Sequence, residues 1–162
     1  MNMAGDEEVH YNLGQAHAKQ RQVENALKHF RKAVDLDPTY WQAWLNLGSL
    51  EALQGNLQEA KVIFRRVAQA QPQRPEAWVN LAHTFLGLRQ SEAAVHAYEQ
   101  ALKVNPRQPR IYAELLQLHF QRGSLSQAKQ LLAIALEYYP QDREKLLQLF
   151  DNMRRRSAAQ RP

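Results

Sequence analysis

The sequence predicts an all-α protein built from four 34-residue helix-turn-helix repeats followed by a C-terminal capping helix. Two observations lead to this prediction: several residue columns recur at a fixed step of 34, and the segments between them carry apolar residues at helical spacing. The proline column consists of Pro38, Pro72, Pro106 and Pro140. Three more columns keep the step, namely Ala26, Ala60, Ala94 and Ala128; Phe30, Phe64, Tyr98 and Leu132; and Leu13, Leu47, Leu81 and Leu115. No insertion interrupts the register, so we expect nine helices and no sheet.

Composition excludes several classes of protein. The 162 residues are 44% hydrophobic and 23% charged, which is ordinary for a globular chain. No apolar run approaches the roughly 18 residues that a membrane helix needs, so no membrane span is expected. The acidic N-terminus lacks the apolar core of a signal peptide, and we expect a cytoplasmic protein if the chain is full length. The absence of cysteine excludes disulfides and thiolate metal sites.

Each repeat is predicted to contain two helices joined by a short turn. In residues 41–74 the first helix runs up to Gln54-Gly55-Asn56, and the apolar stripe of the second helix starts at Leu57. Asn56 and Ser124 each precede a Glu or Gln by three residues, which is the spacing of an N-terminal capping box. We therefore expect both residues to cap second helices.

The prolines mark the predicted helix ends. Pro75 and Pro109 are expected at the first positions of helices, where the missing N–H has no intrahelical partner in any residue. The proline column is expected to end the second helices, because proline disfavours helical geometry in the residue before it.

The last segment is predicted to form a capping helix over residues 143–156. Leu146, Leu149, Phe150 and Met153 form an apolar stripe at helical spacing. The predicted organisation is an N-terminal tail (1–6), four repeats (7–40, 41–74, 75–108 and 109–142), the capping helix and a flexible tail (157–162). Residues 143–162 carry six Lys or Arg and two Asp or Glu, so the excess positive charge is concentrated at the C-terminus.

These motifs resemble the tetratricopeptide repeat. The second repeat carries the pattern most completely, with Trp44, Leu47, Gly48, Phe64 and Pro72 at the family's spacing. The resemblance covers residues 7–142 and implies a right-handed superhelical solenoid. It also implies that the first helices of the repeats line a concave groove.

The sequence gives no support for an enzyme. His10, His17 and His119 occupy columns where the repeat normally packs an aromatic side chain, so packed histidines are expected. His29 and His96 have no HExxH pattern around them, and no phosphate-binding or nucleophile motif is present. We therefore expect no catalytic residues, no metal site and no cofactor.

The resemblance places the fifth, sixth and ninth residues of each repeat on the groove. The predicted peptide-binding residues at these positions are Tyr11, Asn12, Gln15, Leu45, Asn46, Ser49, Val79, Asn80, His83, Glu114 and Gln117. Three asparagines in register resemble the asparagine ladder of the repeats that hold substrates of O-linked N-acetylglucosamine transferase. A carboxamide both donates to and accepts from a peptide unit, although solvation alone also explains asparagine at this position. Glu114 is expected to favour a basic residue at one end of a bound segment.

A carboxylate clamp, as in chaperone-binding members of the family, is not predicted. The corresponding positions hold Tyr11, Gln15, Glu76 and Asn80 in place of the lysine, asparagine and arginine that the clamp needs. A ligand with a C-terminal EEVD-type sequence is therefore disfavoured, and Glu8 and Glu76 would repel it.

The sequence predicts a non-catalytic protein–protein interaction scaffold that binds an extended peptide segment in its groove. The alternative is a targeting or substrate-recruiting module of a larger enzyme or secretion assembly. A protein or peptide partner is expected, and self-association is expected through the repeat ends. Arg154, Arg155 and Arg156 are better explained by favourable cations at a helix C-terminus than by nucleic-acid binding.

Overall fold

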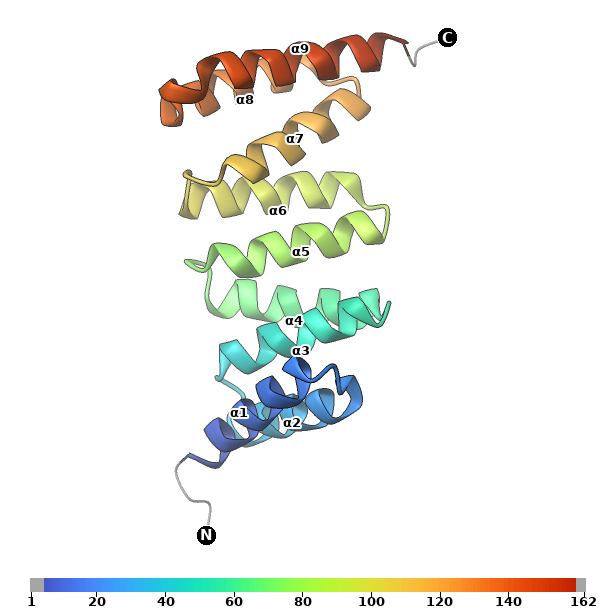
Figure 1. The fold of residues 1–162 in the computed structure, drawn as a ribbon, viewed down its shortest axis with the longest axis vertical. Coiled ribbons are helices and arrows are strands. Elements are labelled where there is room, and N and C mark those ends of the chain that lie inside the picture. Colours follow the sequence, from blue (N-terminus) through green and yellow to red (C-terminus); the bar gives the residue numbers. More distant parts are fainter. Residues whose placement is uncertain (1–4, 160–162) are drawn as a thin grey trace. The chain divides into compact units, whose positions relative to one another are not determined.

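A computed structural model describes residues 5–159, which form nine α-helices, one short 3-10 helix and no strand (Figure 1). The elements are α1 (Asp6–Lys19), α2 (Val23–Leu36), α3 (Trp41–Leu53), α4 (Leu57–Ala70), α5 (Pro75–Gly87), α6 (Ser91–Val104), α7 (Pro109–Gln121), α8 (Leu125–Tyr138), η1 (Pro140–Asp142) and α9 (Arg143–Ala159). The predicted all-α fold is confirmed over this range. None of these helices is both long and apolar enough to cross a membrane.

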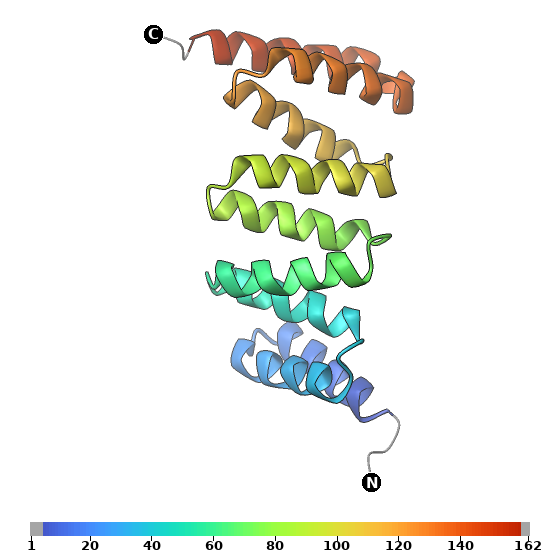
Figure 2. The ribbon, with the colours of Figure 1, turned by 180° about the vertical axis from the view of Figure 1, so that it is seen from behind.

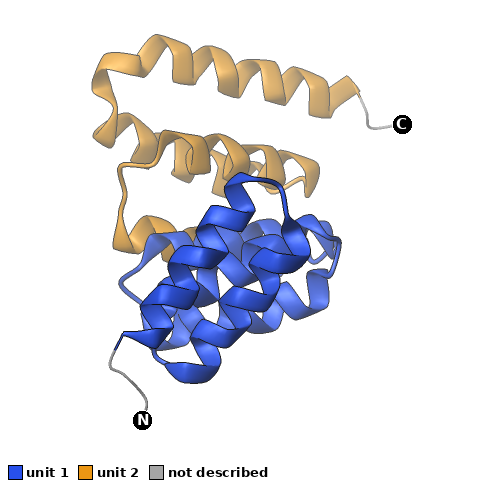
Figure 3. Ribbon diagram, turned by 60° about the horizontal axis from the view of Figure 1, so that its bottom comes forward, with its two compact units in different colours: residues 1–97 blue, residues 98–162 orange. Residues whose placement is uncertain are grey.

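The chain divides into two compact units, residues 1–97 and 98–162 (Figure 3). The division falls inside α6, which is the second helix of the predicted third repeat. The first unit therefore contains α1 to α5 with the start of α6. The second unit contains the rest of α6 with α7, α8 and α9.

Within the first unit, consecutive helices lie side by side and run in alternating directions (Figures 1 and 2). Each second helix of the chain ends two residues before a member of the proline column, at Leu36, Ala70, Val104 and Tyr138. The helices α5 and α7 begin at Pro75 and Pro109. The predicted roles of the prolines at both kinds of helix end are thus confirmed.

The turn between the two helices of every repeat contains a residue in the left-handed region. These residues are Arg21 (φ 59°), Gly55 (φ 83°), Arg89 (φ 59°) and Gly123 (φ 70°), and they are 34 residues apart. In each turn the following N–H donates to a carbonyl five residues earlier, as Gln90 N donates to Phe85 O at 2.8 Å. This is the Schellman arrangement, which satisfies carbonyls that the helix end leaves unpaired.

The two helices of the first and second repeats approach closely at a glycine. A Cβ atom on Gly14 would lie 2.7 Å from the Phe30 ring, and one on Gly48 would lie 2.8 Å from the Phe64 ring. Contacts of this length do not occur between real Cβ atoms and their neighbours. The glycines therefore allow each aromatic ring to fill the space between its two helices.

The core follows the predicted columns with one exception. Leu47, Leu81 and Leu115 are buried, whereas Leu13 is 40% exposed. Leu47 packs in a cluster with Leu27 and other residues of α2, the second helix of the preceding repeat. No described helix precedes α1, so Leu13 has no equivalent neighbour to cover it.

The predicted capping boxes are wrong. Neither Asn56 nor Ser124 makes a side-chain capping hydrogen bond to its helix. The Asn56 side chain turns back to the preceding helix, where its Nδ2 donates to Glu51 Oε2 at 2.8 Å. A buried charge without hydrogen bonds is costly, so a donor to the buried Glu51 carboxylate stabilises the protein more than a cap on the exposed helix end would.

In the second unit, α9 packs against both α7 and α8. The Phe150 side chain is buried, and its ring lies 5.0 Å from the Phe120 ring. The Ser157 hydroxyl donates to the Phe120 carbonyl at 3.2 Å. Leu149 and Met153 are only half-buried, so Phe150 is the one residue of the predicted apolar stripe that is buried among these three.

The ends of the terminal helices differ slightly from the predicted domain boundaries. The helix α9 reaches Ala159 and so includes the first three residues of the predicted tail 157–162. The helix α1 begins at Asp6, inside the predicted tail 1–6. Residues 1–4 and 160–162 lie outside the described part of the chain.

We predict that Arg89→Gly raises the free energy of unfolding by about 0.5–1 kcal/mol. A side chain in the left-handed region costs roughly 1–2 kcal/mol, and part of the gain is offset by the greater freedom of glycine in the unfolded chain. Urea denaturation followed by far-UV circular dichroism measures the change. Arg89→Ala is the matched control, because it removes the arginine and keeps the unfavourable φ. An equal gain from both variants would contradict the explanation by backbone strain.

Candidate functional site

The predicted groove face is carried by the first helices of the repeats. In the first unit these are α1, α3 and α5, and α3 contacts α5 directly. Asn46 and Asn80 therefore lie on neighbouring helices. Tyr11 on α1 reaches the start of α3, since its ring lies 5.0 Å from the ring of Tyr40. Two of the predicted residues, Glu114 and Gln117, lie on α7 in the second unit.

The three asparagines have carboxamides that no other described side chain or carbonyl engages. Asn12 is exposed, and Asn46 and Asn80 are half-buried. The backbone carbonyl of Asn80 accepts a hydrogen bond from the Thr84 hydroxyl at 2.8 Å, but this leaves the carboxamide available. Each free carboxamide offers two donors and an acceptor.

Other predicted groove residues are partly engaged inside the protein. Gln15 Nε2 donates to the Tyr11 hydroxyl at 2.8 Å, and the Ser49 hydroxyl donates to the Leu45 carbonyl at 2.8 Å. The Tyr11 ring also packs 5.9 Å from the core residue Phe30. Tyr11 is therefore largely a packing residue, in contrast to the shallow groove contact that was predicted.

The apolar and polar edges of this face differ in exposure. Leu45 and Val79 are half-buried and offer only part of their side chains. His83 and Gln117 are exposed.

Glu114 does not present the free negative charge that the sequence predicted. Its carboxylate accepts a hydrogen bond from the hydroxyl of the fully buried Tyr98 and pairs with Arg110 Nε at 3.1 Å. Burial and the hydrogen bond to Glu114 raise the pKa of Tyr98 above its usual value, so this phenol stays protonated. Because the Glu114 carboxylate is already paired with Arg110 and hydrogen-bonded to Tyr98, it has little free charge with which to select a basic ligand.

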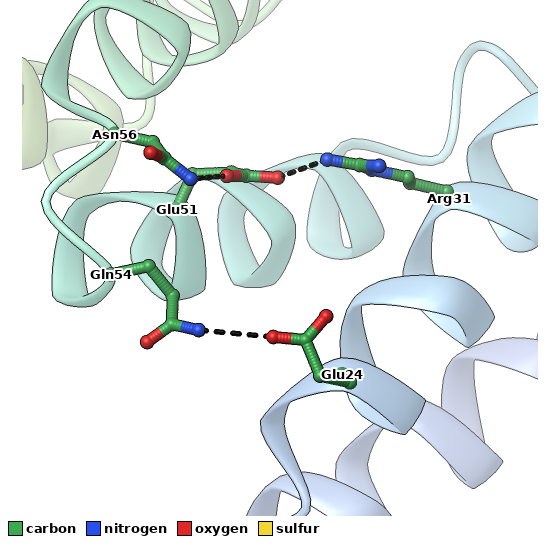
Figure 4. Close-up of polar contacts among 5 residues, drawn as sticks. All are labelled: Glu24, Arg31, Glu51, Gln54 and Asn56. Atoms are coloured by element: carbon green, nitrogen blue, oxygen red, sulfur yellow. Dashed lines mark hydrogen bonds and ion pairs between the residues drawn. The ribbon is translucent and has the colours of Figure 1, made fainter.

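A buried carboxylate links the first two repeats (Figure 4). The Glu51 side chain is 2% exposed and accepts hydrogen bonds from Arg31 Nη2 at 2.5 Å and from Asn56 Nδ2 at 2.8 Å. A second contact nearby joins Gln54 Nε2 to Glu24 Oε1 at 3.2 Å. The sequence pattern did not predict this network, although the 34-residue register places Glu51 in the column of Phe85 and His119.

Tryptophan side chains fix the connections between repeats in the first unit. Trp44 Nε1 donates to the Pro38 carbonyl at 3.0 Å, and Trp78 Nε1 donates to the Pro72 carbonyl at 3.0 Å. The Arg66 guanidinium lies 4.4 Å from the centre of the Trp44 ring. The equal spacing of tryptophan and proline in both repeats was a signal that could have indicated these bonds.

Three histidines cluster where α1 meets α2. One of the rings of His10 and His29 donates a hydrogen bond between their Nδ1 atoms, which are 2.9 Å apart. The ring of His17 stacks on His29 at 5.3 Å. His10 and His17 thus pack as predicted, and the residue that each of them packs against is His29. Among residues 5–159, no three His, Asp or Glu side chains are grouped so that they could hold a metal ion.

Three cavities lie away from the predicted groove face. Their volumes are about 720, 300 and 280 Å³, and none of them is lined by a predicted groove residue. They lie instead between second helices and the neighbouring first helix, outside the predicted groove.

Comparison with protein families agrees with this geometry. A family model described as the tetratricopeptide repeat matches residues 11–75 and 79–143, which is more than half of the chain. The chain belongs to the tetratricopeptide repeat family. Such repeats are in general non-catalytic interaction modules. A search of curated protein sequences finds no match.

Solved structures of other tetratricopeptide repeat proteins share the fold. The crystal structure of MamA has a TM-score of 0.77 and 21% identity, and the match covers 86% of this chain and 82% of that chain. YrrB, a TPR protein with an unusual peptide-binding site, has a TM-score of 0.70 and 20% identity, covering 89% and 82%. The first TPR of Spaghetti (RPAP3) bound to the HSP90 peptide SRMEEVD has a TM-score of 0.70 and 18% identity, covering 75% and 96%. At these identities the similarity establishes the fold alone.

We predict that the tetratricopeptide repeats lose stability as the pH falls from 7.5 to 5.5. Burial, followed by His10, His17 and Lys28, lowers the pKa of His29 below its ordinary 6.5. The unfolded chain therefore takes up this proton at a higher pH than the folded chain. The free energy of unfolding falls as the pH drops through 6.5 toward the folded pKa.

Urea denaturation at the two pH values tests this prediction. His29→Asn should reduce the decline, whereas His96→Asn, at an exposed position of α6, should leave it unchanged. A decline of the same size in all three proteins would show that His29 is not its source.

Proposed function

We propose that this chain is a non-catalytic scaffold that binds an extended, uncharged segment of a partner protein along the face of α1, α3 and α5. The observation that carries the proposal is the set of available carboxamides on Asn12, Asn46 and Asn80, one on each of α1, α3 and α5. The general role of tetratricopeptide repeats as interaction modules supports it, as do the unusual peptide-binding site of YrrB and the HSP90 peptide bound to the first TPR of Spaghetti (RPAP3).

The spacing of the asparagines suits capture of a peptide backbone. Packed helices lie about 8–10 Å apart, and an extended chain advances roughly 3.3 Å per residue. One carboxamide therefore meets about every third residue of a bound strand. Because a carboxamide pairs with a peptide unit irrespective of the side chain, this mode favours loose sequence preference.

Charge at this face favours an uncharged segment. Glu114, on α7, is already paired with Arg110 and hydrogen-bonded to Tyr98, so it supplies no strong preference for a basic ligand. The peptide-binding residues predicted for the first unit include no Lys, Arg, Asp or Glu, and Glu76 at a clamp position disfavours an acidic segment. The half-buried Leu45 and Val79 add limited apolar contact.

We predict that Asn46→Ala weakens binding of such a segment by up to about tenfold. Loss of one hydrogen bond costs about 0.5–1.5 kcal/mol, and the folded chain should be unaffected because the carboxamide has no internal partner. The probes are 12-residue peptides selected from a random display library on the wild-type chain, with affinities measured by isothermal titration calorimetry.

The matched control is Asn25→Ala, which removes an exposed asparagine from α2. It should bind the selected peptides as the wild type does. Equal affinities for the wild type and for the triple variant Asn12→Ala, Asn46→Ala, Asn80→Ala would place the peptide site elsewhere.

We also predict that the peptide SRMEEVD is not preferred over its neutral analogue SRMQQVN. The clamp positions hold Tyr11 and Gln15, which bond to each other, and Glu76, which is exposed and negative. Like charges on the peptide and the protein disfavour the acidic form. Isothermal titration calorimetry of both peptides at low salt checks this prediction, and a tenfold higher affinity for the acidic peptide would refute it.

A further inference from the structure

The helix α1 carries exposed apolar side chains along one side. Val9 is 56% exposed and Leu13 is 40% exposed. Ala16 is exposed as well. Because these residues follow one another at intervals of four and three, they share one side of the helix. We call the surface formed by Val9, Leu13 and Ala16 the outer face of α1.

The equivalent residues of the later repeats are buried. The 34-residue register aligns Val9 with Ala43, Ala77 and Ile111, and it aligns Leu13 with Leu47, Leu81 and Leu115, all of them buried. In α3, Ala43 and Leu47 belong to a cluster with residues of α2, and Leu50, which is the equivalent of Ala16, packs against that cluster. The outer face of α1 is therefore a packing surface whose partner is missing from the described part of the chain.

The outer face of α1 does not have the composition of a polar cap. The exposed end of a repeat array needs a polar outer surface to stay soluble. Here the leucine of its column is kept at Leu13, and Val9 is larger than the alanines at the equivalent positions of α3 and α5. Burying such side chains removes apolar surface from water, so association is favoured. This composition is that of an interaction surface.

The charges of α1 select a particular occupant for this face. The first turn is acidic, with Asp6, Glu7 and Glu8, whereas the last turn carries Lys19 and is followed by Arg21. A helix with negative charge at its start and positive charge at its end is complementary to an antiparallel copy of itself. A parallel copy would bring the carboxylates of both first turns together, and like charges across an interface are costly.

We propose that the outer face of α1 binds the same face of a second copy of this chain, with the two α1 helices antiparallel in a symmetric dimer. A two-fold axis uses one patch on both copies, so each contact occurs twice. Leu13 lies about midway between Asp6 and Lys19 in the sequence, so the two Leu13 side chains meet near the axis. Each Asp6 then lies beside the basic last turn of the other copy.

The dimer leaves the proposed groove open. At about 100° per residue, Tyr11 and Gln15 project from the side of α1 opposite to Leu13. Two copies joined at their outer faces therefore present two asparagine faces to one partner. A partner with two suitable segments would gain avidity from this arrangement. This last consequence rests on the proposed function, whereas the dimer itself does not.

Sedimentation equilibrium of the full chain, from micromolar to near-millimolar concentration, tests for the dimer. We expect the average mass to rise from that of the monomer toward that of the dimer. Leu13→Asp should weaken association by about tenfold or more, because it places a charge in an apolar contact. The matched control is Leu147→Asp on α9, where the leucine is 38% exposed, and it should associate as the wild type does. A wild type that stays monomeric, or an equal loss in both variants, overturns the proposal.

Disulfide cross-linking tests the antiparallel orientation, because the chain contains no cysteine of its own. Leu13→Cys should form a covalent dimer much faster than Leu147→Cys, since a disulfide needs the two Cβ atoms close together. Asp6→Cys should cross-link no faster than Leu147→Cys, because the two Asp6 positions lie at opposite ends of the contact. Rapid cross-linking of Asp6→Cys would show parallel helices, and slow cross-linking of Leu13→Cys would place the contact elsewhere. Either result overturns the proposed dimer.

Discussion

The close approach of the two helices within a repeat is the constraint on which the other contacts depend. At Gly48 there is no room for a Cβ atom, because the Phe64 ring already occupies that position. The aromatic ring can lie fully inside the pair only because the facing residue is minimal. This fixes the rotation of both helices about their axes. The rotation in turn decides that Asn46 projects toward solvent while Leu47 enters the core.

Repetition of this framework lets one position carry different chemistry in successive repeats. The eleventh residue of the first helix is buried whether it is Glu51, Phe85 or His119. In the first case the neighbouring helices supply Arg31 and Asn56, and the charge becomes part of the contact between repeats. In the last case they supply no partner for Nδ1. The backbone thus determines burial, and the side chains around each site determine whether a polar group is satisfied.

Much of the fold follows from periodicity in the sequence, because prolines and glycines act on the backbone locally. The break at Gly55 was predictable, since glycine adopts positive φ without strain. Arg21 and Arg89 have positive φ in the equivalent turns of the first and third repeats, although neither is a glycine. Only the 34-residue register relates these two positions to Gly55. The site was less predictable. The Arg110–Glu114 pair follows from i, i+4 spacing on α7, but the hydrogen bond from Tyr98 to Glu114 depends on side-chain conformations between two helices, which spacing alone does not determine.

The placement of the tryptophans gives the two compact units separate optical signatures. Trp41, Trp44 and Trp78 account for all three indoles of the chain and lie in the first unit, while the second contains only tyrosines and phenylalanines as aromatic chromophores besides histidine. The indoles of Trp44 and Trp78 donate hydrogen bonds to the carbonyls of Pro38 and Pro72, so their emission follows the integrity of the connections between the first three repeats. Indole fluorescence consequently does not report unfolding that is confined to α7, α8 and α9. The gap between an emission midpoint and a backbone dichroism midpoint measures how far the two halves of this solenoid unfold together.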